Sequence, residues 1–410
     1  MKLLVIADDF TGAVDTGVQF SEKGIATVVS TCLEPDFAAF REKAQVLVVD
    51  TESRHLSCDE AYRRVFRLAE SAWRYGISYL YKKTDSTLRG NIGAELNAVL
   101  DASAGGPLMF VPAYPQTGRT TLAGRQYVQG IPLEETVYAR DPFNPVHTGS
   151  IKEILGSCPD VQTTLALGSG IVWPELDRPG TVYVFDASTE EDMKNIGDRL
   201  KDLDKLALTA GCAGFAEYLA ALLPFVRRPV VPPCFAVQTL VLCGSVNETS
   251  LKQLHFAESL GWPTITLSRE QMHRAYWDRP PGENFLQAWD EQLRERGTLV
   301  IKTVNNKEEV DRTLPAREIA GSLGKIAGQL LEKGPCRNLV IFGGDTAIGA
   351  MEALMCDALT PSKEILPGVA VATAACKYKE TVLVTKAGGF GPENVLQLIL
   401  EYIKEQKPSC

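Results

Sequence analysis

The sequence lacks the features that mark membrane and exported proteins. Its longest apolar stretch, residues 218–226, is interrupted by Pro224 and is far shorter than the roughly 20 residues that cross a bilayer. The apolar run at residues 3–7 is followed by two carboxylates and is too short for the apolar region of a signal peptide. We therefore expect a soluble, cytoplasmic protein that has no membrane partner.

The chain also lacks an excess of positive charge. Its 410 residues carry 42 Lys and Arg against 51 Asp and Glu, so the formal net charge is −9. A net negative charge argues against broad electrostatic binding of nucleic acid or of an anionic membrane. We expect neither of them as a partner.

Metal-binding patterns are absent from the sequence. The ten cysteines include no C-x-x-C pair, and the four histidines show no metal-ligand spacing; they are His55, His147, His255 and His273. We predict no metal held by protein ligands. We also expect the cysteines to be free thiols that pack as small hydrophobic residues in a reducing compartment.

What is present is the composition of a globular protein, with 45% hydrophobic and 23% charged residues. The chain is longer than the roughly 250 to 300 residues at which one hydrophobic core usually stops growing. Three of the five residues 229–233 are prolines, which favours an extended linker. We predict an N-terminal domain at 1–228, a linker at 229–235 and a C-terminal domain at 236–410.

Short apolar runs alternate with amphipathic stretches in both halves, which is typical of α/β domains with a mainly parallel sheet flanked by helices. The predicted strands are residues 3–7, 26–30, 46–50, 78–82, 108–112, 181–186, 239–243, 299–303, 339–342 and 381–385. The predicted helices are residues 11–23, 57–74, 91–101, 190–203, 214–223, 247–260, 317–333 and 392–404. Residues 112–160 show little periodicity, and a connection of that length is usually functional or a lid.

Polar side chains follow three predicted strands of the first domain, where open parallel sheets bind their ligands. These loops, residues 8–13, 83–91 and 112–119, supply Asp8, Asp9, Lys83, Asp85, Ser86, Thr87, Arg89, Asn91 and Arg119. Arg89 or Arg119 is suited to bind a carboxylate bidentately, and an aspartate is suited to accept a proton from a hydroxyl. Structural roles stay open: Asp9 as a helix N-cap, Asp85 in a turn, and the arginines in surface ion pairs.

Three glycine-containing turns in the second domain, residues 243–247, 342–349 and 386–391, each follow a predicted strand. Backbone N–H groups at helix N-termini bind phosphate, so the three turns together predict a nucleotide site that includes Gly388 and Gly389. No standard motif is complete: Gly344–Gly349 lacks the Lys and Ser or Thr of a P-loop, and residues 389–394 lack the third glycine of a dinucleotide fingerprint. The alternative is that these glycines only end their strands tightly.

Residues 6–13, 85–93 and 343–346 resemble the four-carbon acid sugar kinases, and the match runs in order from residue 6 to beyond Gly391. The resemblance implies a sugar-acid domain followed by an ATP domain, with the active site in the cleft between them. It implies nucleotide contacts at Ser245, Gly343, Gly344, Asp345, Thr346 and Gly388. It also implies acid contacts at Asp8, Asp9, Asp85, Ser86, Thr87, Arg89 and Asn91.

The predicted reaction is phosphorylation of D-threonate to 4-phospho-D-threonate by ATP, with Mg²⁺ bound to the nucleotide. Asp85, Asp8 and Arg89 are the predicted catalytic residues. Residues 15–17 and 82–84 look most like the D-threonate branch of the family, while D-erythronate, a 3-oxo-tetronate and a non-catalytic sugar-acid sensor stay open. An NAD-dependent dehydrogenase is disfavoured because the glycine fingerprint is incomplete. A homo-oligomer is compatible with this interpretation.

Overall fold

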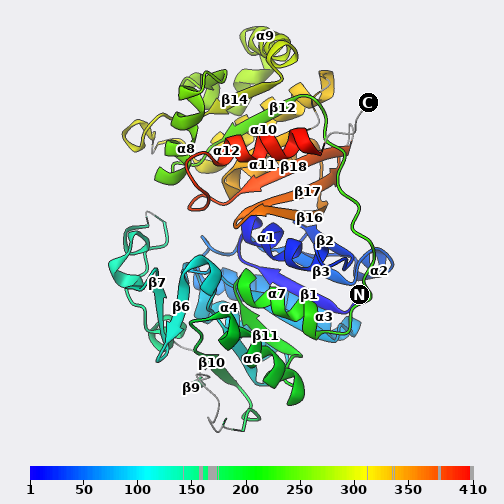
Figure 1. Ribbon diagram of the computed structural model, residues 1–410, viewed down its shortest axis with the longest axis vertical. Helices are drawn as coiled ribbons and strands as arrows, with labels where there is room; N and C mark the ends of the chain where they lie inside the picture. The colour runs from blue at the N-terminus through cyan, green and yellow to red at the C-terminus, as the bar shows by residue number, and fades with distance from the viewer. Residues whose placement is uncertain are drawn as a thin grey trace. The chain divides into compact units, whose positions relative to one another are not determined.

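The computed structural model describes residues 1–141, 143–156, 160–164, 173, 175–311, 313–334, 336, 338–376 and 380–406. The chain divides into two compact units, Met1–Pro229 and Val230–Cys410, each built on a sheet flanked by helices (Figure 1). The predicted two-domain α/β architecture is confirmed. Among the described residues, no helix combines the length and the apolar character needed to cross a membrane.

The first unit contains an all-parallel sheet with the strand order β2-β3-β1-β4-β11-β5-β10-β9. Its strands are β1 (Leu3–Ala7), β2 (Thr27–Ser30), β3 (Val46–Asp50), β4 (Tyr79–Lys83), β5 (Leu108–Val111), β9 (Asp160–Thr164), β10 (Thr181–Phe185) and β11 (Leu208–Gly211). Its helices are α1 (Phe10–Ser21), α2 (Phe37–Arg41), α3 (Cys58–Tyr75), α4 (Ile92–Ala102), α5 (Ile151–Leu155), α6 (Glu190–Asp202) and α7 (Ala213–Leu222).

Helices cover both faces of this sheet, which explains why its strands are almost continuously apolar. Leu4 and Ile6 of β1 face α3 and α4, with which they share one hydrophobic core. Successive side chains of a strand point to opposite faces, so Leu3 and Val5 face the other side, where α1 packs against α7. A capping box formed by Ser57 and Glu60 begins α3.

The segment predicted to lack periodicity forms a small antiparallel sheet with short helical turns. The sheet consists of β6 (Arg119–Leu122), β7 (Arg125–Val128) and β8 (Ile131–Pro132). The turns are η1 (Pro115–Thr117), η2 (Leu133–Glu135) and η3 (Val137–Arg140). Backbone hydrogen bonds between Thr121 and Ala187 attach β6 to the residues that follow β10. This segment therefore lies at the carboxyl edge of the main sheet.

The second unit contains a mixed sheet with the strand order β13-β14-β12-β15-β18-β17-β16. Its strands are β12 (Thr239–Cys243), β13 (Thr264–Thr266), β14 (Thr298–Lys302), β15 (Asn338–Phe342), β16 (Ala358–Leu366), β17 (Val369–Ala375) and β18 (Glu380–Lys386). Its helices are α8 (Glu248–Ser259), α9 (Pro280–Arg296), α10 (Ala316–Lys333), α11 (Gly344–Leu354) and α12 (Val395–Glu405), with turns η4 (Glu270–Met272), η5 (Arg274–Asp278) and η6 (Lys307–Glu309). Helices α8 and α12 pack on one face of the sheet, and α10 packs against α11.

Two expectations for this unit were wrong. The sequence pattern did not predict β13, α9 or the hairpin of β16 and β17, in which β17 is antiparallel to both β16 and β18. The cysteines are also not all free, because Cys356 after α11 and Cys376 after β17 form a disulfide with their Cα atoms 5.0 Å apart. A pair 20 residues apart gives no local signal, since only the hairpin brings the two cysteines together.

Candidate functional site

The strands β1, β3 and β4 end at the same level, which brings their following loops together. Ala7 of β1 pairs in register with Asp50 of β3 and with Lys83 of β4. Asp8 therefore emerges between the loop that follows β3 and the loop that follows β4. We predicted strand β4 one residue too early, and Lys83 is the last residue of the strand rather than the first of the loop.

Arg54, which follows β3, joins three of the predicted aspartates. Its Nε donates to Oδ2 of Asp8 at 2.7 Å, and its two terminal nitrogens donate to Oδ2 and Oδ1 of Asp9 at 2.9 and 2.6 Å. Oδ1 of Asp85 lies 3.7 Å from Nη2 of Arg54. We did not predict Arg54 as a site residue. The rule used for the other loops would have found it, because it lies directly beyond the carboxyl end of a parallel strand.

Lys83 adds a second cation to the same cluster. Its Nζ lies 3.5 Å from Oδ1 of Asp8 and 3.5 Å from Oδ1 of Asp9, and the lysine is only 4% exposed. Oδ1 of Asp8 is buried and accepts no hydrogen bond from the residues that the structure describes. This oxygen therefore keeps lone pairs available for a ligand hydroxyl.

The neighbouring arginine and lysine side chains determine the protonation states of Asp8 and Asp85. Burial by itself would raise the pKa of Asp8, but the charges of Arg54 and Lys83 outweigh it and hold that pKa below its usual value. Burial likewise opposes ionisation of Asp85, yet Arg89 and Arg54 hold its pKa well below the usual range. Both aspartates are therefore ionised at neutral pH.

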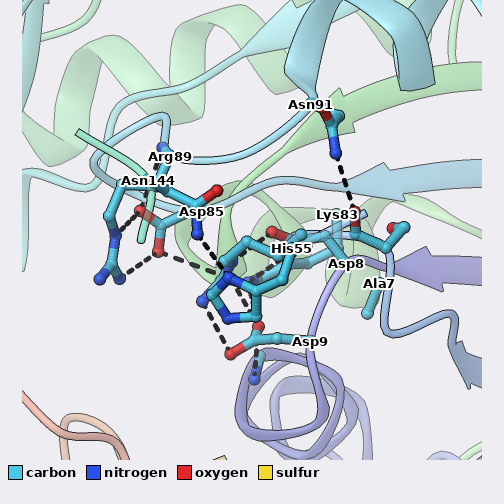
Figure 2. A network of polar contacts seen from close by, with 12 residues as sticks. Ala7, Asp8, Asp9, His55, Lys83, Asp85, Arg89, Asn91 and Asn144 are labelled. Carbon is cyan, nitrogen blue, oxygen red and sulfur yellow. Dashed lines mark hydrogen bonds and ion pairs between the residues drawn. The ribbon is translucent and has the colours of Figure 1, made fainter. Parts of the chain in front are cut away.

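Asp85 and Arg89 form a bidentate pair beside this cluster (Figure 2). Nε of Arg89 donates to Oδ2 of Asp85 at 2.8 Å, and Nη2 donates to Oδ1 at 3.0 Å. The hydroxyl and the backbone N–H of Thr87 also donate to Oδ2 of Asp85, at 2.5 and 3.2 Å, so the turn role considered for this aspartate is real. Both oxygens of Asp85 are therefore engaged by the chain itself.

The antiparallel segment after β5 supplies further polar groups to the site. Asp141 accepts from Nη1 of Arg89 at 3.1 Å, and the ring of Tyr138 lies 5.4 Å from the guanidinium carbon of Arg89. Nη2 of Arg119 donates to the hydroxyl of Tyr138 at 3.3 Å. Tyr138 thus contacts both arginines that we predicted for binding a carboxylate, whereas we predicted neither Tyr138 nor Asp141 from the sequence.

Asp9, Ser86 and Asn91 have structural contacts in addition to their predicted roles. Asp9 is the N-cap of α1, where its side chain accepts from the N–H of Gly12. The carbonyl oxygen of Ser86 accepts from Nε2 of Gln126 at 3.1 Å. The side-chain amide of Asn91 donates to the carbonyl oxygens of Ser53 and Leu56, both at 2.9 Å, and so holds the loop that carries Arg54.

An Asn91→Ala variant should therefore destabilise the first unit by about 1–3 kcal/mol, because two carbonyl groups of the Arg54 loop lose a half-buried donor. Thermal unfolding monitored by circular dichroism measures the effect. Asn97→Ala, at a half-buried position of the same helix, is the matched control and should change stability by less than about 0.5 kcal/mol. Equal melting temperatures for the two variants would contradict this role for Asn91.

A buried ion pair between β4 and α4 supports the loop that carries Arg54. Nζ of Lys82 lies 2.9 Å from Oε2 of Glu95, and both side chains are fully buried. The hydroxyl of Ser53, the residue before Arg54, donates to Oε1 of Glu95 at 2.5 Å. The backbone that positions Arg54 is thus fixed by α4 as well as by Asn91.

In the second unit the three predicted glycine turns converge on Ser245. A β-carbon added to Gly343 would lie 3.3 Å from Cβ of Ser245, and one added to Gly388 would lie 3.6 Å from Oγ of Ser245. Gly343 has φ of +104°, a conformation that favours glycine, and it precedes the first turn of α11. Gly344, Asp345 and Thr346 form that turn, whose backbone N–H groups have no partner within the helix.

Side chains of this unit hold the turns in place. Oγ of Thr346 accepts from the N–H of Gly244 at 3.1 Å, which ties the end of β12 to the start of α11. Ser250 of α8 donates to the carbonyl oxygen of Gly388 at 3.1 Å, and Gln253 donates to those of residues 390–392, each at 3.0 Å. Gly389 is exposed directly after Gly388. The arrangement suits an anionic ligand above the turns.

Comparison with known proteins connects both units to described domains. The family model described as a sugar-binding N-terminal domain matches residues 3–219, and the one described as a nucleotide-binding C-terminal domain matches residues 240–396. A D-threonate kinase of Salmonella typhimurium is 30% identical over 430 residues, covering 99% of each chain. A D-erythronate kinase of Heliobacterium modesticaldum is 28% identical, covering 98% of this chain and 97% of its own; curated 3-oxo-tetronate kinases match as well.

A crystal structure of a Haemophilus influenzae protein has the same fold, with a TM-score of 0.70 at 23% identity over 98% of this chain and 100% of that one. The domain matches cover the loops that carry the Asp8 cluster and the three glycine turns. The family expected from the sequence is thereby confirmed: this chain belongs to the four-carbon acid sugar kinase family, with its sugar-binding N-terminal and nucleotide-binding C-terminal domains.

Proposed function

We propose that this protein is an ATP-dependent kinase that phosphorylates a four-carbon sugar acid, with D-threonate as the first candidate and 4-phospho-D-threonate as the product. The relatives named D-threonate kinase support this choice of acid and reaction. The observation that carries the proposal is Oδ1 of Asp8, a buried carboxylate oxygen that accepts no hydrogen bond from the described residues and lies beside Lys83. Such an atom is suited to bind and deprotonate a hydroxyl group.

In the proposed reaction the 4-hydroxyl oxygen of the acid attacks the γ-phosphorus of ATP, the bond from that phosphorus to the β,γ-bridging oxygen breaks, and ADP leaves. Oδ1 of Asp8 takes the hydroxyl proton. Because the pKa of Asp8 is lowered, this aspartate takes up the proton only late in the phosphoryl transfer. This timing suits a loose transition state, since the attacking oxygen becomes acidic only as its bond to phosphorus forms. Arg54 and Lys83 keep Asp8 ionised and fix its orientation.

We assign the carboxylate of the acid to the arginines around Tyr138. Arg89 and Arg119 both contact this tyrosine, and they come from different loops of the same sheet edge. A guanidinium group matches a carboxylate geometrically, so this pair gives the site its preference for acids over neutral sugars. Asp9, Asp85, Ser86, Thr87 and Asn91 complete the proposed acid site by holding these groups or by accepting substrate hydroxyls.

We assign the nucleotide to the turns that converge on Ser245. The first-turn N–H groups of α11 and the backbone at Gly388 and Gly389 would face the phosphates, where the helix dipole favours negative charge. Mg²⁺ usually binds nucleotide phosphates, waters and one or two carboxylates, and Asp345 offers one exposed carboxylate in the first turn of α11. The described residues contain no cluster of three metal-ligating side chains, so the proposed metal depends on the nucleotide.

D-Erythronate and a 3-oxo-tetronate are the alternative substrates, since relatives are named for each. A non-catalytic sensor of sugar acids is the alternative from another class. The convergence of three glycine turns on Ser245 favours the kinase, because a sensor of the acid alone has no use for a phosphate site in the second unit.

The test is a coupled assay of ADP release with MgATP and a panel of D-threonate, D-erythronate, their L-enantiomers and 3-oxo-tetronates, with a control that contains no acid. We expect turnover to be fastest with D-threonate. Turnover that is fastest with another acid would replace the proposed substrate and keep the kinase. No turnover with any acid, together with no increase in melting temperature when MgATP is added, would refute the kinase proposal.

A further inference from the structure

Among the residues that the structure describes, four lysines are buried, and one of them has no carboxylate partner there. Lys82 is paired with Glu95, Lys83 with Asp8 and Asp9, and Lys302 with Glu258. The fourth, Lys386, is the last residue of β18 and is 0% exposed. Its Nζ donates to Oγ of Ser250 at 3.0 Å and to the carbonyl oxygen of Gly388 at 2.9 Å, both of which are uncharged.

An unpaired ammonium group is costly to bury, and the surrounding residues only partly compensate it. The ring of Phe342, on the neighbouring strand β15, lies 5.1 Å from Nζ of Lys386 and contributes a cation–π interaction. Burial nevertheless lowers the pKa of Lys386 to about 7. A nearby anion would remove this penalty, and the described protein residues do not supply one.

The position of Lys386 indicates which ligand anion would compensate its charge. The lysine lies directly under the Gly388 turn, where that turn meets Ser245. A peptide group is planar with its C=O and N–H pointing in opposite directions. By holding the carbonyl oxygen of Gly388, Lys386 turns the N–H of Gly389 away from the buried ammonium and toward the exposed side of the turn.

We propose that Lys386 is a positioning residue for the nucleotide: it orients the Gly388–Gly389 peptide toward the phosphates and provides the buried positive charge that their negative charge compensates. This inference rests on the proposed nucleotide site in the second unit. It adds a positively charged group to a site that otherwise consists of backbone N–H groups, small side chains and the carboxylate of Asp345.

The other ionisable groups around Lys386 do not supply the missing charge. Cys243, at the end of β12, is the group that acts on it electrostatically, and burial raises the pKa of this thiol to about 11, so that it stays neutral. Glu258 of α8 is bound to Lys302 of β14. Asp345 lies exposed in the first turn of α11, and the residue paired with Lys386 on β17 is the apolar Val369.

The experiment is titration calorimetry of MgADP binding to the full-length protein and to Lys386→Met and Lys386→Gln, between pH 6.5 and 9 and in buffers of different ionisation enthalpy. Lys363→Met, an exposed lysine of the same unit, is the matched control. We expect Lys386→Met to weaken MgADP binding at least tenfold at pH 6.5. Wild-type affinity should fall as the pH rises above about 7, because the bound nucleotide raises the pKa of Lys386. The difference in MgADP affinity between wild type and Lys386→Met should therefore become smaller as the pH rises.

Two further readouts separate this role from a merely structural one. When it binds MgADP near pH 7.5, the wild-type protein should take up more protons than the Lys386 variants do. Any change in the ionisation of the nucleotide itself is common to all three proteins and cancels in this comparison. Without nucleotide, Lys386→Met should melt no lower than wild type, because methionine removes an unpaired buried charge at similar volume. Lys386→Gln keeps a hydrogen-bond donor but carries no titratable group at this position. Its MgADP affinity should therefore also lose the pH dependence seen in wild type.

Each contrary result has its own meaning. Equal affinity and equal pH dependence in wild type and Lys386→Met would overturn the role of Lys386 while leaving the nucleotide site in place. A lower melting temperature of Lys386→Met with unchanged affinity would assign the lysine to folding alone. Failure of the wild-type protein to bind MgADP would refute the proposed nucleotide site itself, and the inference about Lys386 with it.

Discussion

Replacing Asp8 with asparagine should lower kcat for acid phosphorylation by about 10²- to 10⁴-fold, the contribution expected of a positioned proton acceptor. Asparagine is nearly isosteric with aspartate and still offers an oxygen to Nε of Arg54, so the loops should keep their geometry. The amide cannot take a proton from the substrate hydroxyl. Steady-state kinetics with saturating MgATP measure the loss in kcat.

The variant needs a control that removes a charge elsewhere in the same unit. Asp59→Asn, in the exposed first turn of α3, is suitable and should retain wild-type kcat. MgADP should still raise the melting temperature of Asp8→Asn, since the proposed nucleotide contacts lie in the other unit. Full turnover by a folded Asp8→Asn protein would exclude Asp8 as the proton acceptor.

Asp85 was the other candidate proton acceptor, and the structure distinguishes it from Asp8. Both oxygens of Asp85 are occupied by Arg89 and Thr87, whereas Oδ1 of Asp8 accepts no hydrogen bond from the described residues. Asp85→Asn should therefore raise KM for the acid more than it lowers kcat, because Arg89 loses the partner that orients it. The reverse pattern, with a larger kcat loss in Asp85→Asn than in Asp8→Asn, would reassign the base to Asp85.

Replacing Arg54 with methionine should remove acid-dependent turnover and destabilise the first unit by about 3–5 kcal/mol, the range measured when one partner of a buried ion pair is deleted. Arg54 contacts Asp8 and Asp9 directly and lies 3.7 Å from Asp85. Without it, three closely spaced carboxylates face each other with less compensating charge. Hydrogen exchange of the amides in β1 and β3, together with thermal unfolding, measures the effect on this unit.

The pH dependence of this destabilisation has a definite sign. In wild type the pKa values of Asp8 and Asp85 are lowered, so their ionised forms stabilise the fold above the unfolded pKa near 4, and that stabilisation is lost as the pH falls through the folded values. Arg54→Met removes part of this stabilisation. The difference in stability between variant and wild type should therefore be largest near pH 7 and should narrow as the pH falls below about 4, toward the lowered pKa values of Asp8 and Asp85.

Two substitutions control for the loss of the arginine. Arg74→Met removes an exposed arginine from α3 whose partner is Glu70, and it should change stability by less than about 0.5 kcal/mol. Arg54→Lys keeps the charge but cannot bridge Asp8 and Asp9 with a planar fork, so it should recover stability better than activity. Wild-type turnover by Arg54→Met would show that the Asp8 cluster is not part of the acid site.

The alternation of apolar and amphipathic stretches determined the α/β class, because strands covered on both faces must be apolar throughout. All ten predicted strands match their observed counterparts to within one residue at each end; β4 and β14 are displaced by one residue, and β18 extends by one residue on both sides. The elements that were missed have weaker local signals. The hairpin of β16 and β17, for example, contains Pro361 and irregular register, and its pairing depends on contacts with β18.

The sequence by itself determined the family and the loops that carry the candidate site, since residues after parallel strands gather at one edge of a sheet. It did not single out Arg54, Tyr138 or Asp141, because charged and aromatic residues in loops are common and their partners lie far away in the chain. It also did not identify Lys386 as a site residue, although the predicted third glycine turn begins at this lysine. Whether a buried charge is paired depends on which side chains the fold places within a few ångströms, and only the tertiary structure decides that.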